Sequence, residues 1–205
     1  MMHTLIAGVT GSGKSYTEHL LINKLSGRMI LLDPKRVELR KYKDDPRCAY
    51  YANDLDSCMD ALHEGEEIMD GRYRKMEREN KSLFDGEPVY IIVDETAALM
   101  NADKRTRKEC EKMLYNLSFL GRAAKVYVVL CTQRSTADVI PRKISVNLEN
   151  KICLRQQKPV DSRELIGIPD ACELPKIGKC YLYSPDMRRP ERMTPEEAVE
   201  KITEE

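Results

Sequence analysis

The chain of 205 residues is long enough for one α/β domain with a sizeable core and too short for two comfortable ones. Its 34 Lys and Arg balance its 34 Asp and Glu, which excludes a protein that coats nucleic acid with its whole surface. No apolar run approaches the roughly 18–20 residues that span a bilayer, and no signal-peptide pattern is present. We therefore expect one cytoplasmic domain over 1–205, with a core over about 3–184 and a C-terminal tail and helix over 185–205.

The seven cysteines form no C-x-x-C pair, so we expect no structural metal. Several of them lie inside apolar runs. This placement is typical of small buried side chains in a reducing cytosol.

The first predicted strand, at residues 3–7, leads directly into Gly8–Ser15, which fits the phosphate-binding pattern G-x-x-x-x-G-K-[ST]. A helix is predicted over 17–25, so the motif has its proper context and a chance glycine-rich turn is disfavoured. Lys14 would reach the β- and γ-phosphates of ATP, and Ser15 would ligate Mg²⁺. The residues expected to bind nucleotide are Gly8, Thr10, Gly11, Ser12, Gly13, Lys14, Ser15 and Tyr16.

Further strands and helices alternate along the chain, which predicts a mostly parallel sheet with helices on both faces. The strands are expected at 28–32, about 49–51, 89–93, 126–131, 150–154 and 179–183. The helices are expected at 54–79, with an Asp cap, at 104–124, and from Thr194 onward, where Pro195 is suited to the first turn.

The apolar strand at 89–93 ends in Asp94 and Glu95. Ligands bind at the carboxyl edge of such sheets, so Asp94 is predicted to hold Mg²⁺ and Glu95 to be the general base for an attacking water. Alternatively, Glu95 caps the helix that follows it. The adjacent Glu disfavours a small-molecule kinase, which must not hydrolyse its triphosphate.

The strand at 126–131 ends in Thr132 and Gln133. We expect this strand beside the one that ends in Asp94, so the Gln133 amide would orient the water and report on the γ-phosphate. An ordinary loop glutamine is the alternative.

These motifs resemble the motor domain of the FtsK/SpoIIIE DNA translocases, within the larger group that includes HerA. The similar segments occur in the family's order and cover nearly the whole chain: 33–39, 71–76, 121–124, 132–140, 161–166 and 178–183. The resemblance implies a RecA-like P-loop NTPase fold. It also implies that Asp33 and Lys35 are important, and their role could be either γ-phosphate sensing or support of the fold.

The resemblance also implies a ring of identical subunits, expected to be a hexamer, in which one subunit's arginine completes its neighbour's site. Arg163 is the first choice for this role, with Arg122 and Arg155 in reserve. The alternative for Arg163 is a surface arginine paired with Asp161 or Glu164. The chain departs from the family at Thr96, Ala98 and Ser135, and we expect no room for membrane helices or a DNA-reading domain. We therefore expect a minimal motor.

Two basic segments are predicted to contact the phosphates of double-stranded DNA without sequence preference. Neither contains an aromatic residue, which favours duplex over single strands. The first segment could instead be a solvated helix face balanced by nearby acids. The candidate residues are Lys104, Arg105, Arg107, Lys108, Arg134, Arg142 and Lys143.

The sequence therefore predicts ATP-driven translocation of double-stranded DNA in a prokaryotic host, with conjugative transfer or genome packaging for a mobile element or virus as the expected settings. Alternatives are an ATPase of the filamentous-phage-assembly type, and a nucleotide-gated binding or scaffold protein without motor activity.

Overall fold

The computed structural model describes residues 2–204, and the chain divides into two compact units. The first, here called the P-loop unit, comprises the described parts of Met1–Leu25 and Leu130–Glu205. The second, the Asp-Glu unit, is Ser26–Val129. The prediction of a single domain over 1–205 stays a prediction.

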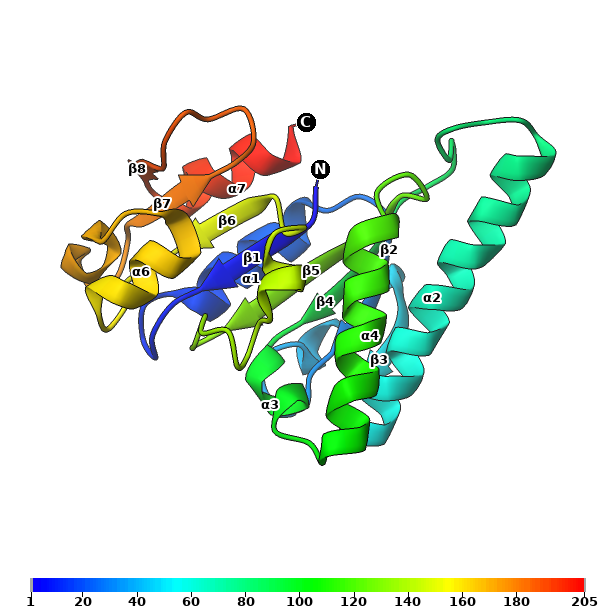
Figure 1. The fold of residues 1–205 in the computed structure, drawn as a ribbon, viewed down its shortest axis with the longest axis horizontal. Helices are drawn as coiled ribbons and strands as arrows, with labels where there is room; N and C mark the ends of the chain where they lie inside the picture. The colour runs from blue at the N-terminus through cyan, green and yellow to red at the C-terminus, as the bar shows by residue number, and fades with distance from the viewer. Residues whose placement is uncertain (1, 205) are drawn as a thin grey trace. The chain divides into compact units, whose positions relative to one another are not determined.

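The Asp-Glu unit contains the strands in the order β3-β2-β4-β5, with β2 parallel to both β3 and β4. Helices α2 and α4 pack side by side against it (Figure 1). Its elements are β2 (Arg28–Leu32), η1 (Arg40–Tyr42), β3 (Cys48–Ala52), α2 (Leu55–Arg78), β4 (Val89–Val93), α3 (Thr96–Met100), α4 (Lys104–Leu120) and β5 (Val126–Thr132), whose last residues belong to the P-loop unit.

The P-loop unit continues the order as β5-β1-β6-β7-β8. Strand β6 is parallel to β1, whereas β7 is antiparallel to both of its neighbours, β6 and β8. Helix α6 and helix α1 lie on opposite faces of this part of the sheet (Figure 1). Its elements are β1 (Thr4–Ala7), α1 (Lys14–Lys24), α5 (Arg142–Ser145), β6 (Asn150–Cys153), α6 (Pro159–Ile166), η2 (Asp170–Glu173), β7 (Cys180–Tyr183), β8 (Glu191–Met193) and α7 (Pro195–Thr203).

The mostly parallel α/β sheet predicted from the sequence is confirmed. Strand β4 is buried at every position, as a central strand requires. The Asp54 side chain accepts a hydrogen bond from the Ser57 N–H and so caps α2, while Thr194 forms a capping box with Glu197 at α7.

Two predicted boundaries are wrong. Helix α1 begins at Lys14 instead of residue 17, because Gly13 at φ 93° lets the chain enter the helix directly from the loop. Helix α4 ends at Leu120 instead of residue 124. Residues 121–125 form turns, and the last of them, Lys125, has a φ of 51°.

Cysteines 58, 110, 131, 153 and 180 are buried, and cysteines 48 and 172 are partly exposed. Burial raises the pKa of Cys58, Cys110, Cys153 and Cys180 to about 12. These thiols are therefore small core side chains, as the sequence predicts.

The Arg72 guanidinium holds together the loops that precede β4 and β5. Its Nη1 donates to the carbonyls of Ala124 (2.8 Å) and Lys125 (3.0 Å), and its Nη2 donates to the carbonyl of Glu87 (2.9 Å). The guanidinium also lies over the Phe84 ring at 4.4 Å. Arg72, in the segment 71–76 of α2, thus stabilises the fold.

Arg72→Leu should lower the free energy of unfolding by about 2–4 kcal/mol, because three carbonyls lose their donor. Urea denaturation measures the change. Arg78→Leu, at an exposed position of the same helix, is the matched control and should change it by less than about 0.5 kcal/mol. Equal effects of the two substitutions would contradict this role for Arg72.

Candidate nucleotide site

The loop between β1 and α1 has the close backbone approach that a phosphate site needs. A Cβ atom on Gly8 would lie 2.4 Å from Ser12 Oγ and 2.7 Å from Leu154 Cβ, so only glycine fits there. The loop is tied to its surroundings by hydrogen bonds from Gly8 N to Thr132 O (3.2 Å) and from Val9 N to Arg155 O (3.0 Å).

The start of α1 has the properties of an anion site. Gly13 occupies the N-cap, and no side chain caps the helix, so the positive end of the α1 dipole faces the loop, where an anion is favoured. Ser12 Oγ is buried without a hydrogen-bond partner among residues 2–204, and Lys14 is only 9% exposed. These residues fit a nucleoside triphosphate.

The structure brings Gln133 to this loop. Thr10 Oγ1 donates a hydrogen bond to Gln133 Oε1 at 2.9 Å, across 123 residues of sequence. The Gln133 side chain is thereby oriented by the phosphate loop itself. Tyr16 is 52% exposed, and its hydroxyl donates to Glu196 Oε1 at 2.5 Å, which ties α1 to α7; its role at the nucleotide stays a prediction.

In the Asp-Glu unit, Asp94 and Glu95 follow β4 and are only 2% and 3% exposed. Glu95 occupies the N-cap position of α3, but its side chain makes no capping hydrogen bond. Instead, Lys35 Nζ donates to Glu95 Oε2 at 2.8 Å. The capping interpretation is therefore wrong for the side chain, which is held as a carboxylate partner of Lys35.

Asp33 explains how Lys35 is placed. Its fully buried carboxylate accepts hydrogen bonds from three backbone N–H groups, those of residues 37, 39 and 40, each at 3.1 Å. The Tyr51 hydroxyl donates to the same carboxylate at 3.2 Å, and the burial and the Asp33 charge together raise the pKa of Tyr51 to about 12. Asp33 thus orders the turn that carries Lys35, and these contacts support the fold.

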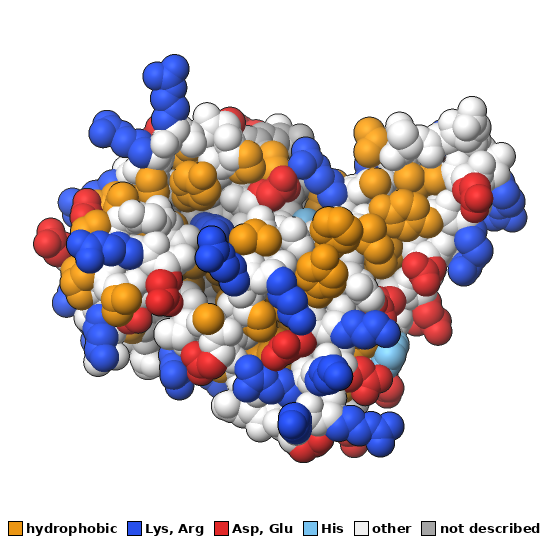
Figure 2. All heavy atoms as spheres, viewed as in Figure 1, with side chains coloured by type: hydrophobic (Ala, Val, Ile, Leu, Met, Phe, Trp, Pro, Cys, Tyr) orange, Lys and Arg blue, Asp and Glu red, His pale blue; other side chains and the backbone are white. Residues whose placement is uncertain are grey.

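The first basic segment forms the opening turns of α4. Lys104, Arg105 and Lys108 are exposed, and none forms an ion pair within the described part of the chain, whereas Arg107 pairs with Glu111 at 3.0 Å. Asp103 accepts hydrogen bonds from the N–H groups of residues 105 and 106 as the helix cap. Figure 2 shows Lys and Arg side chains gathered over this end of α4.

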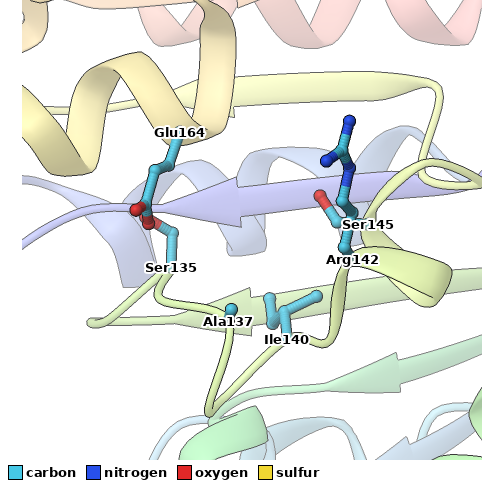
Figure 3. A pocket seen from close by; sticks show the side chains of 6 residues that line it. All are labelled: Ser135, Ala137, Ile140, Arg142, Ser145 and Glu164. Atoms are coloured by element: carbon cyan, nitrogen blue, oxygen red, sulfur yellow. The ribbon is translucent and has the colours of Figure 1, made fainter.

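The second basic segment lies in the P-loop unit. Arg134 pairs with Asp138 at 3.6 Å, and Lys143 is exposed in α5. Arg142 lines a cavity of about 370 Å³ that the loop after β5 forms with α6 (Figure 3). In that cavity the Glu164 carboxylate points toward Ser135, so the loop that follows Gln133 faces the helix that carries Arg163.

Arg163 is exposed on α6, and no ion pair joins it to a carboxylate anywhere in residues 2–204. The alternative of a surface helix arginine is thus borne out for its position but not for its pairing with Asp161 or Glu164, and the role of Arg163 stays a prediction. Of the two reserves, Arg155 donates from Nη1 to the Leu174 carbonyl at 3.1 Å and so supports the fold, while Arg122 is exposed.

Comparison with known proteins identifies the family that the chain resembles. Residues 1–85 match the FtsK/SpoIIIE family. The resemblance drawn from the sequence is thereby confirmed. The DNA translocase FtsK of Chlorobaculum tepidum is 29% identical over 220 residues, which cover 94% of this chain and 27% of that protein. The chain thus spans about a quarter of the length of this FtsK relative.

Two solved structures share the fold. The pCW3 conjugation coupling protein TcpA, solved with ATPγS, has a TM-score of 0.78 at 21% identity and covers 98% of this chain and 65% of its own. B204, the DNA-packaging ATPase of Sulfolobus Turreted Icosahedral Virus, has a TM-score of 0.60 at 16% identity and covers 95% of this chain and 97% of its own. No helix in residues 2–204 of this FtsK-like chain is long and apolar enough to cross a membrane.

Lys35 should be energetically coupled to Glu95. In a double-mutant cycle of Lys35→Met and Glu95→Gln, we expect about 1 kcal/mol of coupling in the free energy of unfolding, a modest value because the Lys35 side chain is 43% exposed. Urea denaturation of the four proteins measures it. Lys35→Arg keeps the charge and should retain most of the stability. Additive single effects would contradict the coupling.

Proposed function

We propose that this chain is an ATP-hydrolysing motor domain that translocates double-stranded DNA in the cytoplasm of a prokaryotic host. The observation that carries the proposal is the buried Glu95 carboxylate, held by Lys35 immediately after Asp94 at the end of β4. A protein that only binds nucleotide has no need of this second carboxylate. The names of the relatives, DNA translocases, support DNA as the cargo.

The two groups of site residues are proposed to act on one ATP. The loop N–H groups and Lys14 would hold the phosphates, while Ser15 and Asp94 would hold Mg²⁺, which supplies charge neutralisation at the phosphate oxygens when bound. Glu95 accepts the proton of the attacking water, and Lys35 keeps that carboxylate oriented. Gln133, already directed by Thr10, orients the water.

We propose that the chain works as a homo-oligomeric ring, with six subunits as the expected number, in which Arg163 completes the neighbour's site. Its exposure and its lack of an ion pair within residues 2–204 leave the guanidinium available to a second subunit. Such a residue contributes about 10³–10⁵ to the rate of hydrolysis, so an isolated subunit should be nearly inactive.

The start of α4 is the proposed DNA surface. Cations in the first turns of a helix oppose its dipole, and in α4 the compensating acid is the cap residue Asp103, because the first turn holds none. Its Lys and Arg therefore carry a cost to the helix that contact with DNA phosphates would offset. Arg134, Arg142 and Lys143 form the second proposed contact. TcpA and B204 make conjugative transfer and genome packaging the settings that we propose.

Long duplex DNA should stimulate ATP hydrolysis by this chain. Glu95→Gln should abolish the stimulated rate while leaving ATP binding intact, because the proton acceptor is removed and the residues proposed to bind the phosphates are unchanged. Phosphate release and nucleotide binding are measured with and without DNA. Tight ATP binding with no turnover under any DNA condition would contradict the motor.

Replacing Lys104, Arg105 and Lys108 together by Ala should weaken duplex binding and reduce the slope of log affinity against log salt by about 0.9 for each DNA phosphate that is no longer neutralised. The effect should be equal for unrelated DNA sequences. Substituting Ala for Arg74, an exposed arginine of α2, is the control. An unchanged salt dependence would show that α4 does not contact the phosphates.

A further inference from the structure

A basic groove crosses the P-loop unit beside the end of α6. It has a volume of about 480 Å³. Its cations come from separate elements: Lys151 from β6, Arg163 from α6, and Arg188 and Arg189 from the segment after β7. Tyr183, the last residue of β7, lines it as well.

The positive charge of this groove is not neutralised internally. None of the four cations forms an ion pair within residues 2–204 of the chain. Glu164 is the acid among the lining residues, and its carboxylate points toward Ser135 in the neighbouring cavity (Figure 3). Burial lowers the pKa of Lys151, which indicates that water alone stabilises its charge poorly.

Complementing the dipole of α6 does not account for this cluster. Arg163 lies in the last turn of the helix, where a cation is favourable. The other three cations belong to different elements and are still directed to the same groove. With a net charge of zero for the chain, this is a local concentration that fits an anionic ligand.

Two tyrosines add aromatic surface to the groove. Tyr181 and Tyr183 are two residues apart in β7, so they lie on the same face of the sheet, and both are partly exposed. Tyr181 lines a second groove, together with Arg192 and the acids Asp170 and Glu191, of which Glu191 pairs with Lys201 at 3.1 Å. This groove shares Ile168, Arg189 and Pro190 with the first. The two grooves therefore adjoin at these three residues.

The spacing of the two tyrosines fits an extended strand. Residues two apart in a strand are separated by about 6.6 Å, roughly twice the 3.4 Å axial spacing of nucleotides in duplex DNA. Neighbouring bases of a duplex are stacked on each other and cannot reach both rings. Cations that follow a backbone, together with aromatic rings that stack on bases, are the features of sites for single strands.

We propose that these adjoining grooves, defined by Lys151, Tyr181, Tyr183, Arg188, Arg189 and Arg192, form a binding site for single-stranded nucleic acid. This site is separate from the duplex contacts at α4 and at 134–143, and it does not depend on motor activity. The tyrosine rings stack on successive bases, and the cations contact the phosphates. The chain can thereby hold a single strand as well as a duplex.

The test is fluorescence anisotropy of a labelled oligothymidylate of about 12 nucleotides and of a labelled duplex, without ATP. Tyr183→Leu keeps apolar volume but removes the ring, and should weaken binding of the oligothymidylate about 5- to 100-fold while duplex binding changes less than about twofold. Tyr183→Phe keeps the ring and should bind like the parent. The matched control is Tyr50→Leu, on β3, which should bind the oligothymidylate like the parent.

Arg188→Ala with Arg189→Ala should lower the salt slope for the oligothymidylate by about 1.4, and Arg74→Ala with Arg78→Ala should not. The melting temperature of each variant shows whether it is folded. If Tyr183→Leu does not fold, Tyr181→Leu is used for the same test. Parent-like binding by both Leu variants, equal losses with Phe and Leu, or parallel losses for the duplex would each overturn the proposal.

Discussion

A buried parallel strand cannot carry a charged side chain until it ends, and this constraint places the whole candidate site. Strand β4 is buried at all five of its residues before Asp94, and β5 is buried from Val128 through Thr132 before Gln133. Strand β1 likewise has no exposed residue before the phosphate loop. The chemistry is therefore confined to the short segments that follow strands, where a ligand can approach.

A second set of residues holds the first in position. Asp33 orders a turn through three backbone N–H groups, the turn carries Lys35, and Lys35 contacts Glu95. In the other unit, Thr10 orients Gln133. In both cases a candidate catalytic side chain is fixed by a partner that is distant in sequence, an arrangement that would need little reorganisation on binding a ligand.

The strands, the long helix α2 and the phosphate loop could be predicted from the sequence, because apolar runs, caps and glycine spacing are local signals. The partner of Glu95 could not, since Lys35 lies 60 residues away and only folding brings the two together. Nor could β8, a strand of only three residues. The tyrosines of β7 read as ordinary strand residues, and only the fold shows which grooves they line.

The burial of the cysteines has a practical consequence for biophysical work. A thiol with a pKa of about 12 is almost entirely protonated at neutral pH, and the thiolate is the species that reacts. Four native cysteines should thus remain silent toward maleimide dyes in the folded protein. Spectroscopic probes can be attached at new surface positions once Cys48 and Cys172, which are partly exposed, have been replaced.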